Sequence, residues 1–181
     1  HGNGYTISGL SLTEGLSVAG LFQRVQEGAR IEDLNVSGSV KASSACEAAG
    51  GLAGRNEGEI ENCSFSGSVS GSSTTGGLVG ENTASGVIRA SKSGGAVTGS
   101  KMTGGIVGSS RGKIVDCVNG AYVNTVSGDQ AISLENVNLD FSLDMTKLTT
   151  GDALLSSYDT GGITGYNAGT IRACENRAIV G

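Results

Sequence analysis

The chain has 181 residues, among them 32 glycines and no proline or tryptophan, with a net charge of −5 and an isoelectric point near 4.8. This composition argues against a nucleic-acid partner, because such binding needs a concentrated cationic surface and no basic cluster occurs. It also argues against membrane insertion, because no apolar run reaches the length that spans a bilayer.

A glycine-bounded segment recurs along the chain in copies that start near residues 19, 49, 75, 103 and 160. The spacings between the second glycines of successive copies are 31, 26, 28 and 57 residues, and these glycines are Gly20, Gly51, Gly77, Gly105 and Gly162. A repeat with a period in this range predicts a solenoid or a similar array.

Equivalent positions in the copies form columns of like residues. One column is Leu21, Leu52, Leu78, Ile106 and Ile163, and a second is Ile31, Ile60, Ile88, Ile114 and Ile171. Beyond the isoleucine column there is one step of three residues and then a series of steps of two. Steps of two indicate a strand with one buried face, and the single step of three indicates a corner or a bulge.

Each copy is too small to bury its own apolar face, so it has to stack on neighbouring copies. The sequence therefore predicts one all-β domain over 1–181, a parallel β-helix or solenoid of about six rungs with about 28 residues per rung. A rung of this length favours a right-handed, three-sided helix. A β-prism or another closed repeat of short strands is the alternative.

The doubled spacing before the last copy predicts a sixth, degenerate copy over 125–143. Its apolar residues reproduce the steps of three, two, two and two: Leu134, Val137, Leu139, Phe141 and Leu143. Residues 144–159 then form an inserted loop or short helix, and the last copy occupies 160–181. Because the chain starts at His1 and ends within a repeat, we expect it to be a piece of a longer protein.

The stretch GGLAGRNEGEIENC at 50–63 resembles the GLUG motif of bacterial surface proteins, and the opening HGNGYTISGLSL is similar to the segment that often precedes GLUG arrays. The resemblance implies a secreted or cell-surface bacterial protein, often adhesin-like. It also implies an alternative, a non-catalytic region of a secreted IgA-cleaving metallopeptidase of the M26 type. It implies no particular ligand.

The sequence offers few residues that are suited to catalysis. The only histidine is His1, and HExxH is absent, so neither a zinc peptidase site nor a histidine-based nucleophile is predicted. The glycines lack the pattern of a phosphate loop. An acid pair on an outer face, as in carbohydrate-active β-helix enzymes, is the third alternative. The outward column that would carry it has mixed charge and indicates a solvated face: Glu32, Glu61, Arg89, Val115 and Arg172. We therefore expect no enzyme and no cofactor.

Calcium is the one metal that the sequence suggests, and only weakly. Four acids cluster in and beside the insertion, Asp140, Asp144, Asp152 and Asp159, and calcium prefers oxygen ligands. Neither an EF-hand spacing nor a calcium-binding nonapeptide accompanies them.

Loops on rigid scaffolds often carry function, so residues 144–166 are the predicted contact surface. Its candidate residues are Lys147, Asp152, Tyr158 and Tyr166. The partner would be a host or bacterial surface protein or a glycan. As an equal alternative, the leucines of the insertion fold back onto the solenoid.

Two further columns bear polar or sulfur side chains. Cys63 and Cys117 fall two rungs apart, and the degenerate copy would separate Cys117 from Cys174, so free packed thiols are predicted in place of disulfides. Cys46 is predicted to be unpaired as well. Asparagines recur in the turn after the glycines, at Asn56, Asn82 and Asn167, and predict a ladder of side-chain amides.

These inferences predict a non-catalytic stalk or interaction scaffold outside the cell.

Overall fold

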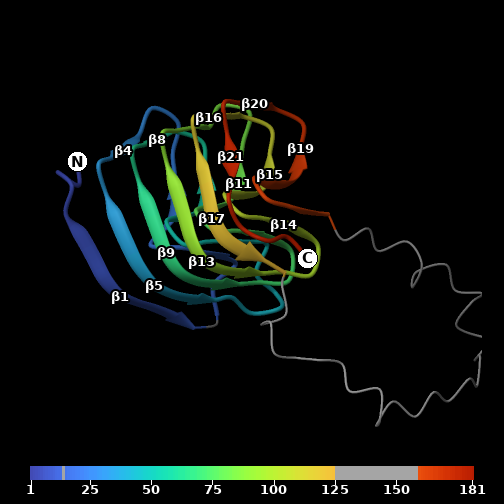
Figure 1. Ribbon diagram of the computed structural model, residues 1–181. Helices are drawn as coiled ribbons and strands as arrows, with labels where there is room; N and C mark the ends of the chain where they lie inside the picture. The colour runs from blue at the N-terminus through green and yellow to red at the C-terminus, as the bar shows by residue number, and fades with distance from the viewer. Residues whose placement is uncertain (14, 125–158) are drawn as a thin grey trace, which may run out of the picture. The chain divides into compact units, whose positions relative to one another are not determined.

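The computed structural model describes residues 1–13, 15–124 and 159–181, and all regular secondary structure in these residues is β (Figure 1). The strands pair in parallel and form four sheets, so the predicted parallel β-solenoid is confirmed. No helix in the described part of the chain has the length and apolar character needed to cross a membrane.

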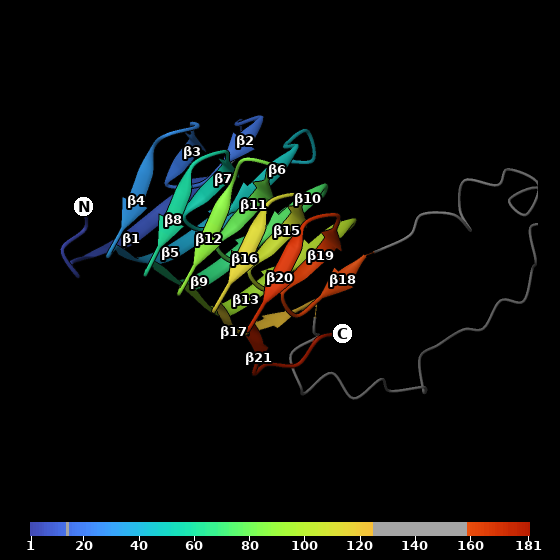
Figure 2. The ribbon, with the colours of Figure 1, turned by 90° about the horizontal axis from the view of Figure 1, so that it is seen from above.

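Each of the four sheets runs along the stack, with one strand from each successive turn of the chain, as the rows of labelled strands in Figure 2 show. Sheet A consists of β1 (Thr6–Thr13), β5 (Asn35–Lys41), β9 (Ser64–Ser70), β13 (Lys92–Thr98), β17 (Val118–Val123) and β21 (Glu175–Asn176). Sheet B consists of β2 (Val18–Ala19), β6 (Ala48–Gly50), β10 (Thr74–Gly76), β14 (Met102–Gly104) and β18 (Thr160–Gly161). Sheet C consists of β3 (Phe22–Val25), β7 (Ala53–Asn56), β11 (Val79–Asn82), β15 (Val107–Ser110) and β19 (Thr164–Asn167). Sheet D consists of β4 (Arg30–Glu32), β8 (Glu59–Glu61), β12 (Val87–Arg89), β16 (Lys113–Val115) and β20 (Thr170–Arg172).

Each rung follows the chain through sheets B, C, D and A in turn, and the described residues form five such rungs. The long strand β1 precedes the first rung and pairs with β5 in sheet A. Two details thus differ from the sequence-based prediction. A rung has four strands where a three-sided helix was favoured, and the residues that the structure describes form five rungs where about six were expected for the chain. The strands of sheets B and D are three residues or shorter, too short for alternation to mark them separately.

The predicted columns form the core. Ile60, Ile88 and Ile114 are direct partners in sheet D and are fully buried, and Leu52 and Leu78 are equally buried at the start of sheet C. In-register stacking of identical apolar residues about 4.8 Å apart lets each rung bury the face that it cannot bury alone.

The fifth rung stacks directly on the fourth. Strand β16 pairs with β20, and β17 pairs with β21, so no rung separates them. The prediction that a degenerate rung lies between Cys117 and Cys174 is therefore wrong. The expected degenerate copy at 125–143 and the insertion at 144–159 lie outside the described residues, apart from Asp159.

The step of three residues between sheets D and A is a left-handed corner. The same position has φ between 48° and 55° in every rung: Asp33, Asn62, Ala90, Asp116 and Ala173. This confirms the predicted corner, and Ala90 and Ala173 adopt there a conformation that costs a residue with a Cβ roughly 1–2 kcal/mol.

The paired glycines at the start of each copy serve close packing. A Cβ on Gly51 would lie 2.2 Å from the ring of Phe65, and one on Gly77 would lie 2.2 Å from the carbonyl oxygen of Gly105. Neither Gly51 nor Gly77 has a positive φ. These glycines therefore supply space for close packing rather than a left-handed turn.

The predicted amide ladder is present and buried inside the stack. Asn56 donates to the side-chain oxygen of Asn82 at 2.9 Å, and Asn82 donates to the hydroxyl of Ser110 at 3.2 Å. Each asparagine also bonds the backbone of its own turn, and Asn167 continues the column at the exposed last rung. These asparagines are on strands β7, β11 and β19 and have ordinary φ values. Their role is therefore to form hydrogen bonds with buried backbone groups, not to favour a turn.

Candidate functional site

A groove of about 410 Å³ runs across several rungs where the outer sides of sheets B and C meet. Its walls come from both sheets and from the segments that precede sheet B: Glu47, Ser73, Thr74, Glu81, Met102, Ser109, Arg111 and Tyr166. Because the rungs repeat in register, residues that are distant in sequence line one continuous surface.

Glu81 is the electrostatic centre of this groove. It lies on β11 and accepts hydrogen bonds on one carboxylate oxygen from Arg55 of the rung below, at 2.8 and 2.5 Å. Its other oxygen lies 3.7 Å from the guanidinium of Arg111, which follows β15. The carboxylate is thus held between two cations from neighbouring rungs, a stable arrangement that leaves N–H groups of Arg111 free to face a ligand.

Tyr166 forms the end of the groove on β19, with 43% of its surface exposed. It continues the outward column of sheet C and pairs in register with Ser109. Tyr166 is thus the predicted contact residue that the structure places on a concave surface. The other predicted contact residues, Lys147, Asp152 and Tyr158, lie outside the described residues.

The groove combines one aromatic face, the thioether of Met102, several hydroxyl groups and a charged Glu–Arg pair. Aromatic and apolar surfaces bind the flat or apolar faces of a ligand, while hydroxyl and guanidinium groups bind its polar atoms. Such a lining suits reversible binding of a polar chain molecule, either an extended peptide or a glycan.

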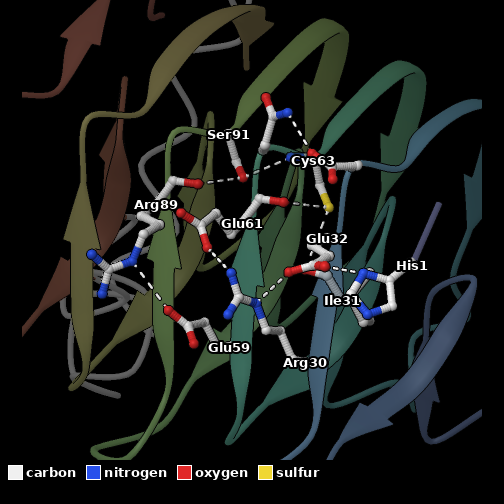
Figure 3. Close-up of polar contacts among 11 residues, drawn as sticks. His1, Arg30, Ile31, Glu32, Glu59, Glu61, Cys63, Arg89 and Ser91 are labelled. Carbon is white, nitrogen blue, oxygen red and sulfur yellow. Dashed lines mark hydrogen bonds and ion pairs between the residues drawn. The ribbon is translucent and has the colours of Figure 1, made fainter. Parts of the chain in front are cut away.

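The outer face of sheet D carries the predicted column of mixed charge, and in its first three rungs the charges are paired (Figure 3). Arg30 contacts Glu32 at 2.5 Å and also bonds Glu61 of the next rung, and Arg89 donates to Glu59 at 3.1 Å. The Arg30–Glu61 and Arg89–Glu59 pairs cross between rungs, so they support the stacking weakly, as exposed ion pairs do.

The described residues contain no group of three histidine, cysteine, aspartate or glutamate side chains that could hold a metal ion. Three of the four aspartates of the weak calcium prediction, Asp140, Asp144 and Asp152, lie outside the described residues. The fourth, Asp159, uses its backbone carbonyl to accept a bond from the N–H of Thr103 at 2.8 Å. Calcium binding stays a prediction for the insertion.

All four cysteines are free thiols in the structure. Cys63 and Cys117 are buried, as their column predicts, and Cys46, which lies outside the column, is buried as well. Burial raises the pKa of Cys46 and Cys63, and it raises the pKa of Cys117 to about 12. Cys174, in the last rung, is half-buried.

Sequence reasoning missed most of the groove. Glu81, Ser109 and Tyr166 occupy one position of the repeat, immediately before the ladder residue, and the copies could have been compared at that position. Glu47 and Met102 gave no such signal, because they precede the glycines on which the copies are aligned. Glu47 lies in the connection before β6, and Met102 is the first residue of β14.

Comparison with protein-family models finds one match, described as the GLUG motif, at residues 45–70. These residues form the second rung with the corner that leads into it, and they contain the stretch that resembled this motif in sequence. Searches of curated proteins and of solved structures found no match.

Proposed function

We propose that this chain, whose second rung carries the GLUG motif, is a non-catalytic structural or adhesion module of a secreted or cell-surface bacterial protein. It acts as a stalk or as an interaction scaffold. The observation that supports this most directly is the in-register stacking of five rungs, in which the recurring residues of the motif serve as core columns, corners and ladders.

The ion pairing of the outward carboxylates supports a module without catalytic activity. The outward carboxylates of sheet D and Glu81 in the groove are engaged by arginines of neighbouring rungs. General acid–base catalysis by paired carboxylates needs carboxylates that are free to exchange a proton with a substrate, whereas these carboxylates are occupied by ion pairs.

The groove between sheets B and C is the contact surface that best suits this role. Its partner would be a protein or a glycan on a host or bacterial surface, and Tyr166 and Arg111 would contribute most to binding, since aromatic and arginine side chains dominate interface energetics.

Binding is tested by immobilising the chain and passing host surface proteins and a glycan array over it. Tyr166→Ala combined with Arg111→Ala is expected to reduce binding at least tenfold, because anchors of this kind are worth about 2 kcal/mol. Tyr122→Ala is the matched control, because Tyr122 is 52% exposed but lies on sheet A outside the groove. Equal loss in both variants, or none in either, would argue against the groove.

Two further measurements address location and catalysis. Antibodies against the chain should label intact cells of the bacterium that produces it, and labelling only after lysis would refute a surface location. Polysaccharides incubated with the chain should release no new reducing ends. Release that disappears in Glu81→Gln would show the enzyme alternative to be correct.

A further inference from the structure

Cys117 and Cys174 occupy the same column on directly adjacent rungs. We infer that these two thiols are a site of disulfide formation, which locks the fifth rung to the fourth when the chain meets a small-molecule disulfide such as oxidised glutathione. The inference concerns the chain itself and holds whatever partner the groove binds.

The backbone around both cysteines is in register. Asp116 donates its N–H to the carbonyl of Arg172 at 3.0 Å, and Glu175 donates to the carbonyl of Cys117 at 2.9 Å. Strand pairs before and after the cysteines keep the same offset, Val115 with Arg172 and Val118 with Glu175. Neighbouring parallel strands lie about 4.8 Å apart, which is within the range of about 4.4–6.8 Å between the Cα atoms of a disulfide.

The side chains also have the same orientation. The Sγ of Cys117 lies 3.3 Å from the carbonyl of Val115, and the Sγ of Cys174 lies 3.2 Å from the carbonyl of Arg172, the equivalent position one rung on. Cys174 also reaches back to the carbonyl of Ile114 in the fourth rung, at 3.6 Å. The two sulfurs therefore lie one above the other inside the stack.

No other cysteine pair in the described residues has this relation. Cys63 belongs to the same column, but Ser91 of the third rung separates it from Cys117, and the hydroxyl oxygen of Ser91 accepts a hydrogen bond from the Cys63 N–H at 3.1 Å. Two rungs correspond to about 9.6 Å, too far for a bond. Cys46 lies outside the column, in the segment before sheet B.

The burial of the two thiols sets the order of the reaction. Cys174 is half-buried in the last described rung, so its thiolate attacks one sulfur of the small-molecule disulfide, forms a mixed disulfide and releases one small thiol. Cys117 then loses its proton, and its thiolate attacks the sulfur of Cys174 and releases the second small thiol. Two protein thiols are oxidised to one disulfide, and one small disulfide is reduced to two thiols.

The second step is slow near neutral pH, because burial raises the pKa of Cys117 to about 12 and little thiolate is present. The same burial then shields the finished bond from reductants. A disulfide at this place joins two residues that are 57 positions apart in the chain and thereby ties the last rung to the stack.

The experiment treats the folded chain with oxidised glutathione at mildly alkaline pH, then denatures it, alkylates the remaining thiols and digests it without reduction. Mass spectrometry is expected to find the peptide of Cys117 linked to that of Cys174, and the free thiols should fall from four to two. Cys174→Ser should lose the linked pair, while Cys63→Ser, the matched control from the same column, should keep it.

Three results would overturn the inference. These are four thiols remaining after prolonged oxidation of the folded chain, a bond that uses Cys46 or Cys63, and a bond between two chains, which a non-reducing gel detects. Because the disulfide is mapped in the unsubstituted chain, this result does not depend on whether any variant folds. Oxidation should also slow amide hydrogen exchange in β20 on the order of tenfold, because opening of the last rung is restricted; unchanged exchange in the bonded chain would refute the locking.

Discussion

Asn82 occupies the middle of the buried amide ladder, and replacing it with alanine is expected to destabilise the solenoid strongly. Its side chain accepts from Asn56 at 2.9 Å, and it donates to the hydroxyl of Ser110 and to the carbonyl of Gly86, both at 3.2 Å. Water has no access to this position, because Asn56, Asn82 and Ser110 are fully buried. The variant would remove the donor to the hydroxyl of Ser110 and the acceptor for the amide of Asn56, while the carbonyl of Gly86 would keep the bond that it accepts from the N–H of Lys113 at 2.9 Å.

The expected loss follows from these three hydrogen bonds. An intramolecular hydrogen bond contributes about 1 kcal/mol net, and an orphaned buried group costs at least that much, so Asn82→Ala should lower the free energy of unfolding by about 3 kcal/mol. Asn167 is the matched control, since it occupies the same column but is exposed in the last rung and bonds only its own turn, at Gly169. Asn167→Ala should lose less than about 1 kcal/mol, because water replaces its partners.

Urea unfolding followed by circular dichroism measures both losses under the same conditions. Asn56→Ala and the double variant complete a cycle, in which the coupling energy between Asn56 and Asn82 should be about 1 kcal/mol. Equal losses for Asn82→Ala and Asn167→Ala, or a coupling energy near zero, would refute the view that the ladder stabilises the interior of the stack.

Three other predictions concern packing, backbone and ionisation. Gly51→Ala should lower the free energy of unfolding by about 3 kcal/mol, because its Cβ would lie 2.2 Å from the ring of Phe65. Gly94→Ala is the control, with 3.8 Å to the nearest atom, and should unfold at the same urea concentration as the parent. Similar unfolding midpoints for both variants would contradict the packing role of Gly51. Ala90→Gly should raise the melting temperature and stabilise the chain by up to about 1 kcal/mol, because Ala90 has a φ of 48°, and a lower melting temperature would count against strain at this corner. Burial raises the pKa of Cys117 from 9.0 to about 12, so the contribution of this thiol to the free energy of unfolding is complete below pH 9.0 and is lost as the pH rises toward 12. Urea unfolding at increasing pH should therefore show a smaller loss of stability at alkaline pH in Cys117→Ala than in the parent. An identical loss in both would contradict this prediction.

The core columns were predictable because stacking in register places identical repeat positions on one another. Ile60 and Ile88 are therefore partners in the structure, as the period of the repeat requires. The four-strand rung was not predictable, since a strand as short as Glu59–Glu61 shows no alternation of its own. The direct contact of the last two rungs was not predictable either, because chain length alone does not say which segments pair.

The candidate site was predictable only in part. Tyr166 was found because aromatic residues are rare in this chain and because it follows the break in the repeat. Its neighbours Glu47 and Met102 precede the glycines on which the copies are aligned, and they meet Tyr166 only after the rungs have stacked. The left-handed corner, in contrast, was visible in the sequence, because a step of three residues interrupts the steps of two at Asn62 and Ala90.

The connections from sheet A to sheet B differ greatly in length, although the rungs on both sides remain in register. They comprise residues 14–17, 42–47, 71–73, 99–101 and 124–159. The entropy cost of closing a loop grows only slowly with its length, so the pairing of the flanking strands tolerates a long excursion at this position. In a solenoid of this kind the chain can therefore become longer without adding a rung. The connection from sheet A to sheet B is the place where additional sequence can be inserted while the flanking strands keep their register.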